Sequence, residues 1–202
     1  MIDDQRRTDW NERHGQGWFE GEGPNAALQS AVANLPVGTA LDLATGGGTN
    51  AVWLASIGWQ VTAVDWSSVA LAKGRAEADR AGVSVEWLER DLFTWSPTPR
   101  SYDLVTVVYL HLPPDERRSV YVAAADAVTS GGRLVIVGHD RLNAKEGEGG
   151  PPDDGRLFTP DELALLLRTD SSGFEIERAE TIRRVPPPAR GPIDALLVAR
   201  RR

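Results

Sequence analysis

The chain has 202 residues, with 22 Lys and Arg against 29 Asp and Glu, and a formal net charge of −7. This length predicts one domain, and the hydrophobic fraction of 41% and charged fraction of 25% are typical of a globular protein. The absence of Cys excludes disulfides, thiolate metal sites and cysteine nucleophiles. The acidic balance argues against nucleic acid as a partner, because such binding usually requires a basic face.

Hydropathy also argues against a membrane protein. Apolar runs stay well below the roughly 18–20 residues of a membrane span, and the first residues lack the apolar stretch of a secretory signal. We therefore expect a cytoplasmic protein, and the sequence does not indicate its oligomeric state.

The predicted elements alternate between strands and helices along most of the chain. Residues 1–23 are polar with a few aromatic side chains, and a helical pattern follows Pro24. Strand-like runs are then expected at 40–43, 61–64, 83–87, 104–108 and 134–137, and helices at 49–57, 67–81 and 114–129. Such alternation is typical of βαβ units and of a parallel sheet that is buried on both faces.

The last third of the chain has a different pattern. Residues 143–156 are rich in Gly, Glu and Pro and predict a mobile loop, after which Thr159 and Glu162 form a capping-box sequence that starts a helix. The segments 174–185 and 193–200 look like two long strands without a helix between them, so they should pair antiparallel. The whole chain predicts a single doubly wound α/β domain, 1–202, with a Rossmann-like seven-stranded sheet that is mostly parallel and has an antiparallel last strand.

The stretch LDLATGGGTN, residues 41–50, joins a strand to a helix through three glycines. This layout places a ligand against backbone N–H groups beside a helix N-terminus. Gly46, Gly48 and Ala51 also fit the loose dinucleotide fingerprint, with Asp65 where a ribose-binding acid would fall, so an NAD-type oxidoreductase is one interpretation.

Two acids favour a different ligand. Asp42, directly before the turn, would repel the pyrophosphate of a dinucleotide. Asp91, after the third predicted strand, suits a ligand that offers amino and ribose groups rather than phosphates.

With these motifs the sequence resembles the class I S-adenosylmethionine-dependent methyltransferases, most closely the small bacterial tellurite-resistance-type and thiopurine-methyltransferase-like enzymes. The resemblance covers roughly residues 8–200 and rests on LDLATGGGTN, VTAVDWS, ERDLFTW, YLHLPP, GGRLVIVGHD and the closing hairpin. Ala44-Thr45-Gly46 stands where the family usually has Gly-Cys-Gly or similar. The resemblance implies methyl transfer from S-adenosylmethionine to a small-molecule substrate, with S-adenosylhomocysteine as the product and without a metal.

The resemblance also implies a set of cofactor-binding residues. In the family the acid and glycines of the first motif hold the methionine portion, the acid that ends the second strand binds the ribose, and the acid after the third strand faces the adenine amino group. Residues 1–23 correspond to a lid segment that folds over the cofactor. The implied residues are Asp42, Ala44, Thr45, Gly46, Gly48, Asn50, Asp65, Trp66, Asp91, Leu92, Val108 and Trp10.

Substrate residues are expected where the fourth and fifth strands end, because ligands lie outside the carboxyl ends of strands in open parallel sheets. His111 is the candidate general base, and Arg13 and Arg141 are candidates to neutralise an anionic substrate. The other candidate substrate residues are His14, Trp18, Tyr109 and His139. Besides the oxidoreductase, a non-catalytic S-adenosylmethionine-binding regulatory protein is an alternative, and the sequence does not identify the methyl acceptor.

Overall fold

The computed structural model describes residues 4–16, 23–151, 153–185 and 189–202, so two expected lid aromatics, Trp18 and Phe19, lie outside the described residues. The helices are α1 (Asp4–Gly15), α2 (Ala26–Val32), α3 (Thr49–Ser56), α4 (Ser68–Ala81), α5 (Pro114–Ala127), α6 (Asn143–Glu146), the 3₁₀ helix η1 (Asp154–Arg156) and α7 (Pro160–Asp170). The strands are β1 (Thr39–Leu43), β2 (Gln60–Asp65), β3 (Val85–Glu89), β4 (Tyr102–Val108), β5 (Val128–His139), β6 (Phe174–Arg183) and β7 (Ile193–Arg201).

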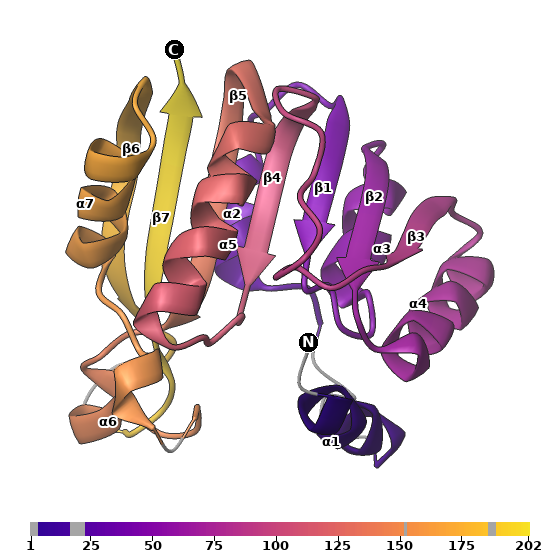
Figure 1. Ribbon diagram of the computed structural model, residues 1–202, viewed down its shortest axis with the longest axis horizontal. Coiled ribbons are helices and arrows are strands. Elements are labelled where there is room, and N and C mark those ends of the chain that lie inside the picture. Colours follow the sequence, from indigo (N-terminus) through magenta and orange to yellow (C-terminus); the bar gives the residue numbers. More distant parts are fainter. Residues whose placement is uncertain (1–3, 17–22, 152, 186–188) are drawn as a thin grey trace.

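The seven strands form one sheet in the order β3-β2-β1-β4-β5-β7-β6 (Figure 1). The first five strands are parallel, and β7 runs antiparallel to both β5 and β6. The predicted fold class is thus confirmed. Because the strand order reverses between β1 and β4, the carboxyl ends of these two strands mark the position where doubly wound sheets bind ligands.

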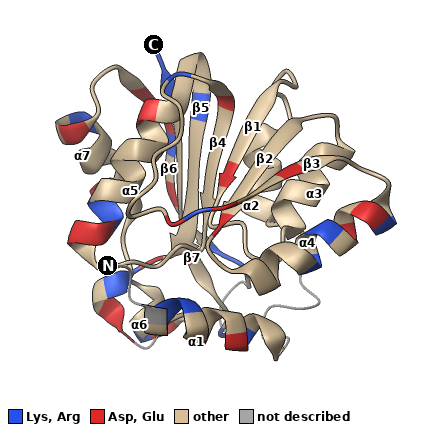
Figure 2. Cartoon of the chain, turned by 45° about the vertical axis from the view of Figure 1, so that its right-hand side comes forward, with Lys and Arg blue, Asp and Glu red and all other residues tan. Residues whose placement is uncertain are grey.

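Helices cover both faces of the sheet, and each face has its own core. Leu41 and Leu43 point toward α5 and α7, where they join a cluster with Tyr121 and Leu163. Their neighbour Ala40 points the other way and packs with side chains of α2 and α3. Charged residues of both signs lie along α1, α4, α5 and α7, whereas the central strands β1, β2 and β4 carry few of them (Figure 2). Among the described helices, none combines the length and apolar character needed to cross a membrane.

Two predicted segments differ from the observed ones. β5 begins at Val128, directly after α5, and not near Leu134, because its first residues already pair with β4 before the register shifts around Gly131 (φ +81°). The segment 143–156, expected to be a mobile loop, contains α6 and η1. Asn143 anchors it: this buried side chain accepts a hydrogen bond from Ile193 N at 2.8 Å and donates one to Gly149 O at 2.8 Å.

The expected capping box at the start of α7 is present. Thr159 Oγ1 accepts from Glu162 N at 3.2 Å, and Glu162 Oε2 accepts from Thr159 N at 2.8 Å. Thr159→Ala should therefore lower the free energy of unfolding by about 1 kcal/mol. Thr169→Ala, near the other end of the same helix, serves as the control and should change it by less than about 0.5 kcal/mol. Urea unfolding of the three proteins measures the difference, and equal values for both variants would contradict a role for the cap.

Candidate active site

The glycine turn, residues 44–48, leaves β1 at the point where the sheet reverses its strand order. Ala44, Gly46 and Gly48 all have left-handed backbone conformations, with φ of +55°, +56° and +77°. A Cβ at Gly48 would lie 2.4 Å from Trp87 Cη2, so only glycine fits there. Ala44 adopts the same conformation with a side chain, which costs about 1 kcal/mol. The turn thus keeps a tight, strained path that brings its backbone to the carboxyl edge of the sheet.

Asp42 lies beneath this turn and is 1% exposed. Its carboxylate accepts hydrogen bonds from the hydroxyls of Thr45 and Thr106, both at 2.6 Å. Burial raises the pKa of Asp42 to about 6, although both hydroxyls favour the ionised form, and the nearby carboxylate of Asp65 raises it further. A cation beside the turn would relieve the cost of this buried charge.

Asp65 ends β2 and joins that strand to the glycine turn. Its Oδ2 accepts from Gly46 N and its Oδ1 from Ser67 N, both at 2.9 Å. Burial also raises the pKa of Asp65, while these backbone donors act in the opposite direction. A carboxylate offers about four lone-pair positions, so Asp65 keeps acceptor capacity for further hydroxyl donors.

A pocket of about 340 Å³ lies next to Asp65. Its lining includes Trp66 and Asp91, so the structure brings together two residues that the sequence analysis placed near an adenine. Asp91 also accepts from Phe93 N at 3.0 Å, which fixes the turn after β3. Leu92 instead packs against the core on the α5 face. The rest of the pocket is lined by Arg7, Glu89 and Arg90.

Helix α1, which belongs to the segment predicted to be a lid, lies beyond the carboxyl edge of the sheet (Figure 1). Asn11 Oδ1 accepts from Ser67 Oγ at 2.6 Å, and Arg6 forms an ion pair with Glu116 at 3.0 Å. The buried His14 ring lies over the glycine turn, where a Cβ at Gly46 would be 3.4 Å from its Cε1. Two other candidate site residues lie on α1: the predicted cofactor residue Trp10 is half-buried, and the predicted substrate residue Arg13 is exposed and stacks on the Trp10 ring at 5.2 Å.

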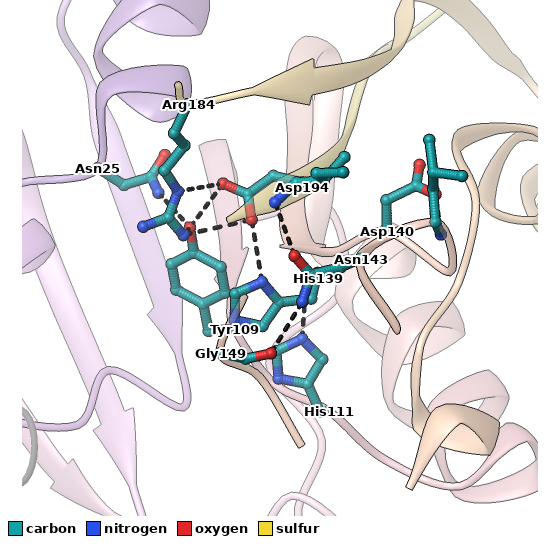
Figure 3. A network of polar contacts seen from close by, with 11 residues as sticks. Asn25, Tyr109, His111, His139, Asp140, Asn143, Gly149, Arg184 and Asp194 are labelled. Atoms are coloured by element: carbon teal, nitrogen blue, oxygen red, sulfur yellow. Dashed lines mark hydrogen bonds and ion pairs between the residues drawn. The ribbon is translucent and has the colours of Figure 1, made fainter. Parts of the chain in front are cut away.

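A second polar cluster lies beyond the ends of β4 and β5 (Figure 3). The rings of His111 and His139 stack at a centroid distance of 5.2 Å and an angle of 11°, and Tyr109 packs against His139 at 5.2 Å. Tyr109 has a φ of +59°, a strained conformation for a residue with a side chain. The exposed Arg141 pairs with Glu162 at 2.7 Å, outside this cluster.

The geometry around His111 does not fit the base role expected from the sequence. Its Nε2 accepts a hydrogen bond from His139 N at 2.9 Å, so that lone pair is already used. The pKa of His111 is lowered to about 3, mainly by burial and to a smaller extent by the neighbouring His139. His111 is therefore neutral near pH 7, with its proton on Nδ1, and it helps to hold the end of β5.

Three residues of this cluster were missed by the sequence analysis. Asp194, at the start of β7, is 2% exposed and accepts from Tyr109 OH at 2.8 Å and from Arg184 Nε at 2.6 Å. Asn25 Nδ2 donates to Tyr109 OH at 3.1 Å, and Asn25 N donates to Asn50 Oδ1 at 2.9 Å. Asp194 had one detectable signal, since it is a lone acid in an apolar strand.

Comparison with known proteins agrees with the observed fold and with the position of the glycine turn in it. Residues 40–132 match the family model described as a methyltransferase domain. None of the curated proteins compared matches the sequence significantly. The magnesium protoporphyrin IX methyltransferase of Synechocystis PCC 6803 with bound S-adenosylhomocysteine has a TM-score of 0.73 at 18% identity, with 98% of this chain and 99% of that chain covered.

Two further solved structures have the same fold. TehB of Haemophilus influenzae gives a TM-score of 0.72 at 15% identity, covering 95% of this chain and 67% of that one. The DhpI–S-adenosylhomocysteine complex gives 0.68 at 24% identity, covering 98% and 96%. The chain thus contains a methyltransferase domain, and its fold is shared with S-adenosylmethionine-dependent methyltransferases. This match favours the methyltransferase interpretation over the oxidoreductase.

The raised pKa of Asp42 predicts how stability depends on pH. Because its pKa rises from 3.8 in the unfolded chain to about 6 in the folded one, Asp42 stabilises the fold below pH 4 and loses this contribution as the pH rises through 6. Asp42→Asn should therefore gain about 2–3 kcal/mol of unfolding free energy relative to the wild type between pH 4 and pH 7. Urea unfolding of both proteins across this range measures the gain, and a constant difference would contradict the burial of an ionised carboxylate.

Proposed function

We propose that this enzyme transfers the methyl group of S-adenosylmethionine to a small-molecule acceptor. The observation that carries the proposal is the pair of buried carboxylates, Asp42 and Asp65, on the two sides of the glycine turn. When bound, S-adenosylmethionine supplies a methyl group on a positively charged sulfur. Its ammonium group, ribose hydroxyls and adenine amino group are the kinds of donors and cations that such an acidic edge attracts.

The remaining residues around the turn fit the same ligand. Asp65 would accept from the ribose hydroxyls, Trp66 would cover the adenine, and Asp91 would face the adenine amino group. Asp42 would stabilise the methionine ammonium through the turn above it, with Thr45 and Thr106 fixing its carboxylate. The backbone of Gly46 and Gly47 provides the close approach, since no atom of the described residues lies within 4 Å of a Cβ built at Gly47.

The acceptor would lie between the glycine turn and the Tyr109–His139 cluster. A path of hydrogen bonds connects the two regions: Asn50, at the start of α3, bonds Asn25, which bonds Tyr109. In this proposal, the methyl group and the side chains after β4 and β5 would border one space. The charge and size of the acceptor would be set there, by Tyr109, His139 and the segment around α6.

Asp65→Ala tests the cofactor site. Loss of two hydrogen bonds to a charged acceptor should weaken S-adenosylhomocysteine binding by about 2–4 kcal/mol in calorimetric titration. Asp103→Ala is the control, because this acid, like Asp65, accepts from a backbone N–H, here that of Thr39, but it lies at the opposite edge of the sheet. Wild-type affinity in a folded Asp65→Ala protein would remove Asp65 from the site.

Turnover is measured with S-adenosylmethionine and three small acceptors that differ in the accepting atom: phenol, thiophenol and aniline. An acceptor that gains a methyl group, detected by mass spectrometry, supports the proposed methyltransferase activity. Tight cofactor binding without methylation of any acceptor would favour the regulatory alternative.

The lid gives a further prediction. Since α1 lies across Gly46 and Ser67, a bound ligand should add contacts to it, and amide exchange in residues 5–15 should slow when S-adenosylhomocysteine is added. Helix α7 lies away from α1 and is the internal reference (Figure 1). Equal protection of α1 with and without the ligand would show that it does not act as a lid.

A further inference from the structure

The side chains of His139 and Asp194 form a buried pair next to the proposed acceptor space. The two residues lie opposite one another in the antiparallel pairing of β5 with β7. His139 Nδ1 is 3.3 Å from Asp194 Oδ1, and the two side chains are 13% and 3% exposed. Within the described part of the chain, Nδ1 has no hydrogen-bond partner of good geometry. The Asp194 carboxylate is the acceptor group that lies beside it.

The carboxylate of Asp194 is held firmly from its other side. Tyr109 OH donates to Oδ2 at 2.8 Å, and Arg184 bonds both oxygens, at 2.6 Å through Nε and at 3.2 Å through a terminal nitrogen. Arg184 also lies over the Tyr109 ring at 5.1 Å. Asp194 therefore keeps a fixed position from which Oδ1 faces the imidazole (Figure 3).

The imidazole of His139 is also held in place. His111 stacks on one side of its ring and Tyr109 packs nearby, while the His139 backbone N–H is fixed by His111 Nε2. A Cβ at Gly150 would lie 2.8 Å from His139 Cδ2, so the loop after α6 passes the ring without a side chain. Because Nδ1 lies beside the Asp194 carboxylate, we expect the ring to carry its proton on Nδ1, which leaves the lone pair of Nε2 for another group.

We propose that His139 is the catalytic base of the methyl transfer, that Asp194 and Tyr109 position it, and that the acceptor is a hydroxyl that reaches the site with its proton. This inference rests on the proposed function. The oxygen lone pair of the acceptor forms the bond to the methyl carbon, and the carbon–sulfur bond breaks with its electron pair remaining on sulfur. The hydroxyl proton passes to His139 Nε2, and the resulting imidazolium is stabilised by Asp194 before it releases the proton to water.

An aspartate that faces the distal nitrogen of a histidine selects the tautomer and stabilises the protonated ring. The charged and titratable groups around His139 are Asp194 on β7, Arg184 after β6, and Tyr109 and His111 after β4. Asp140, the next residue along the chain, turns away: it accepts from Leu142 N and from Thr181 Oγ1, both at 2.8 Å. Asp140 is equally buried, at 3%, and is thus a matched control for Asp194.

The first measurement does not depend on turnover. The chain has three histidines, so the imidazole ¹⁵N resonances of His139 can be assigned by substitution in the complex with S-adenosylhomocysteine. In the wild type these resonances should show the proton on Nδ1, and Asp194→Asn should change this tautomer preference, because the carboxylate beside Nδ1 is gone. Asp140→Asn should leave the preference in place. An unchanged tautomer in folded Asp194→Asn overturns the pairing.

The second measurement is kcat with phenol and with thiophenol. His139→Ala should keep its affinity for S-adenosylhomocysteine and lose about 10²–10⁴ in kcat with phenol, and much less with thiophenol, which ionises more readily. Asp194→Asn should lower kcat with phenol more than with thiophenol, whereas Asp140→Asn should not change the ratio of the two.

The possible failures are distinct. If His139→Ala keeps the wild-type kcat with phenol, His139 is not the catalytic base. If kcat falls equally with both acceptors, the role of His139 is structural. A wild-type protein that binds the cofactor but methylates none of the acceptors overturns the proposed function, and this inference with it.

Discussion

The fold places two buried carboxylates on adjacent strands, next to the point where the strand order of the sheet reverses. The electrostatic cost of these two charges determines which ligands the site favours. Asp42 and Asp65 end or nearly end adjacent strands, and burial raises the pKa of both. Among the described residues, the hydrogen bonds of both acids come from hydroxyls and backbone N–H groups and not from a cationic side chain. A ligand with hydroxyl groups and a positive charge lowers the free energy of such an arrangement, whereas a pyrophosphate raises it.

The same constraint explains the shape of the glycine turn. Asp65 takes the N–H of Gly46 and Asp42 takes the hydroxyl of Thr45, so two successive residues of the turn are tied to the two acids. The turn is fixed by charge-assisted bonds before any ligand binds, and its left-handed residues are the cost of that path. Preorganisation of this kind reduces the ordering that binding would otherwise require.

Much of the fold and of the cofactor side was predictable from the sequence, because these features are local. Strand–turn–helix patterns predicted the sheet, and the acids at strand ends were found by their distance from the glycines. The second cluster was not predictable in the same way. Asp194 and Arg184 come from the closing hairpin and meet Tyr109 only when β7 inserts beside β5.

The expectation for His111 shows this limit most clearly. Its place after β4 suggested a base, but the sequence gives no sign that the backbone N–H of His139, on the neighbouring strand, occupies its Nε2. The position at the end of a strand determines which residues reach a site. Whether the histidine there keeps a free nitrogen lone pair depends on the hydrogen bonds from the neighbouring strand, and only the structure shows these bonds.

The two clusters are joined by one continuous set of contacts, and this has a consequence for catalysis. Asn50, in the first turn of α3, bonds Asn25, and Asn25 bonds Tyr109, whose hydroxyl reaches the carboxylate that faces His139. The helix that follows the glycine turn therefore supports, through two side chains, the group that orients the proposed base. Methyl transfer depends on the distance between the methyl group and the acceptor atom, so positioning alone accounts for a large part of the rate. In the proposed mechanism, the hydrogen bonds from Asn50 through Asn25 and Tyr109 to Asp194 would help to set both ends of that distance.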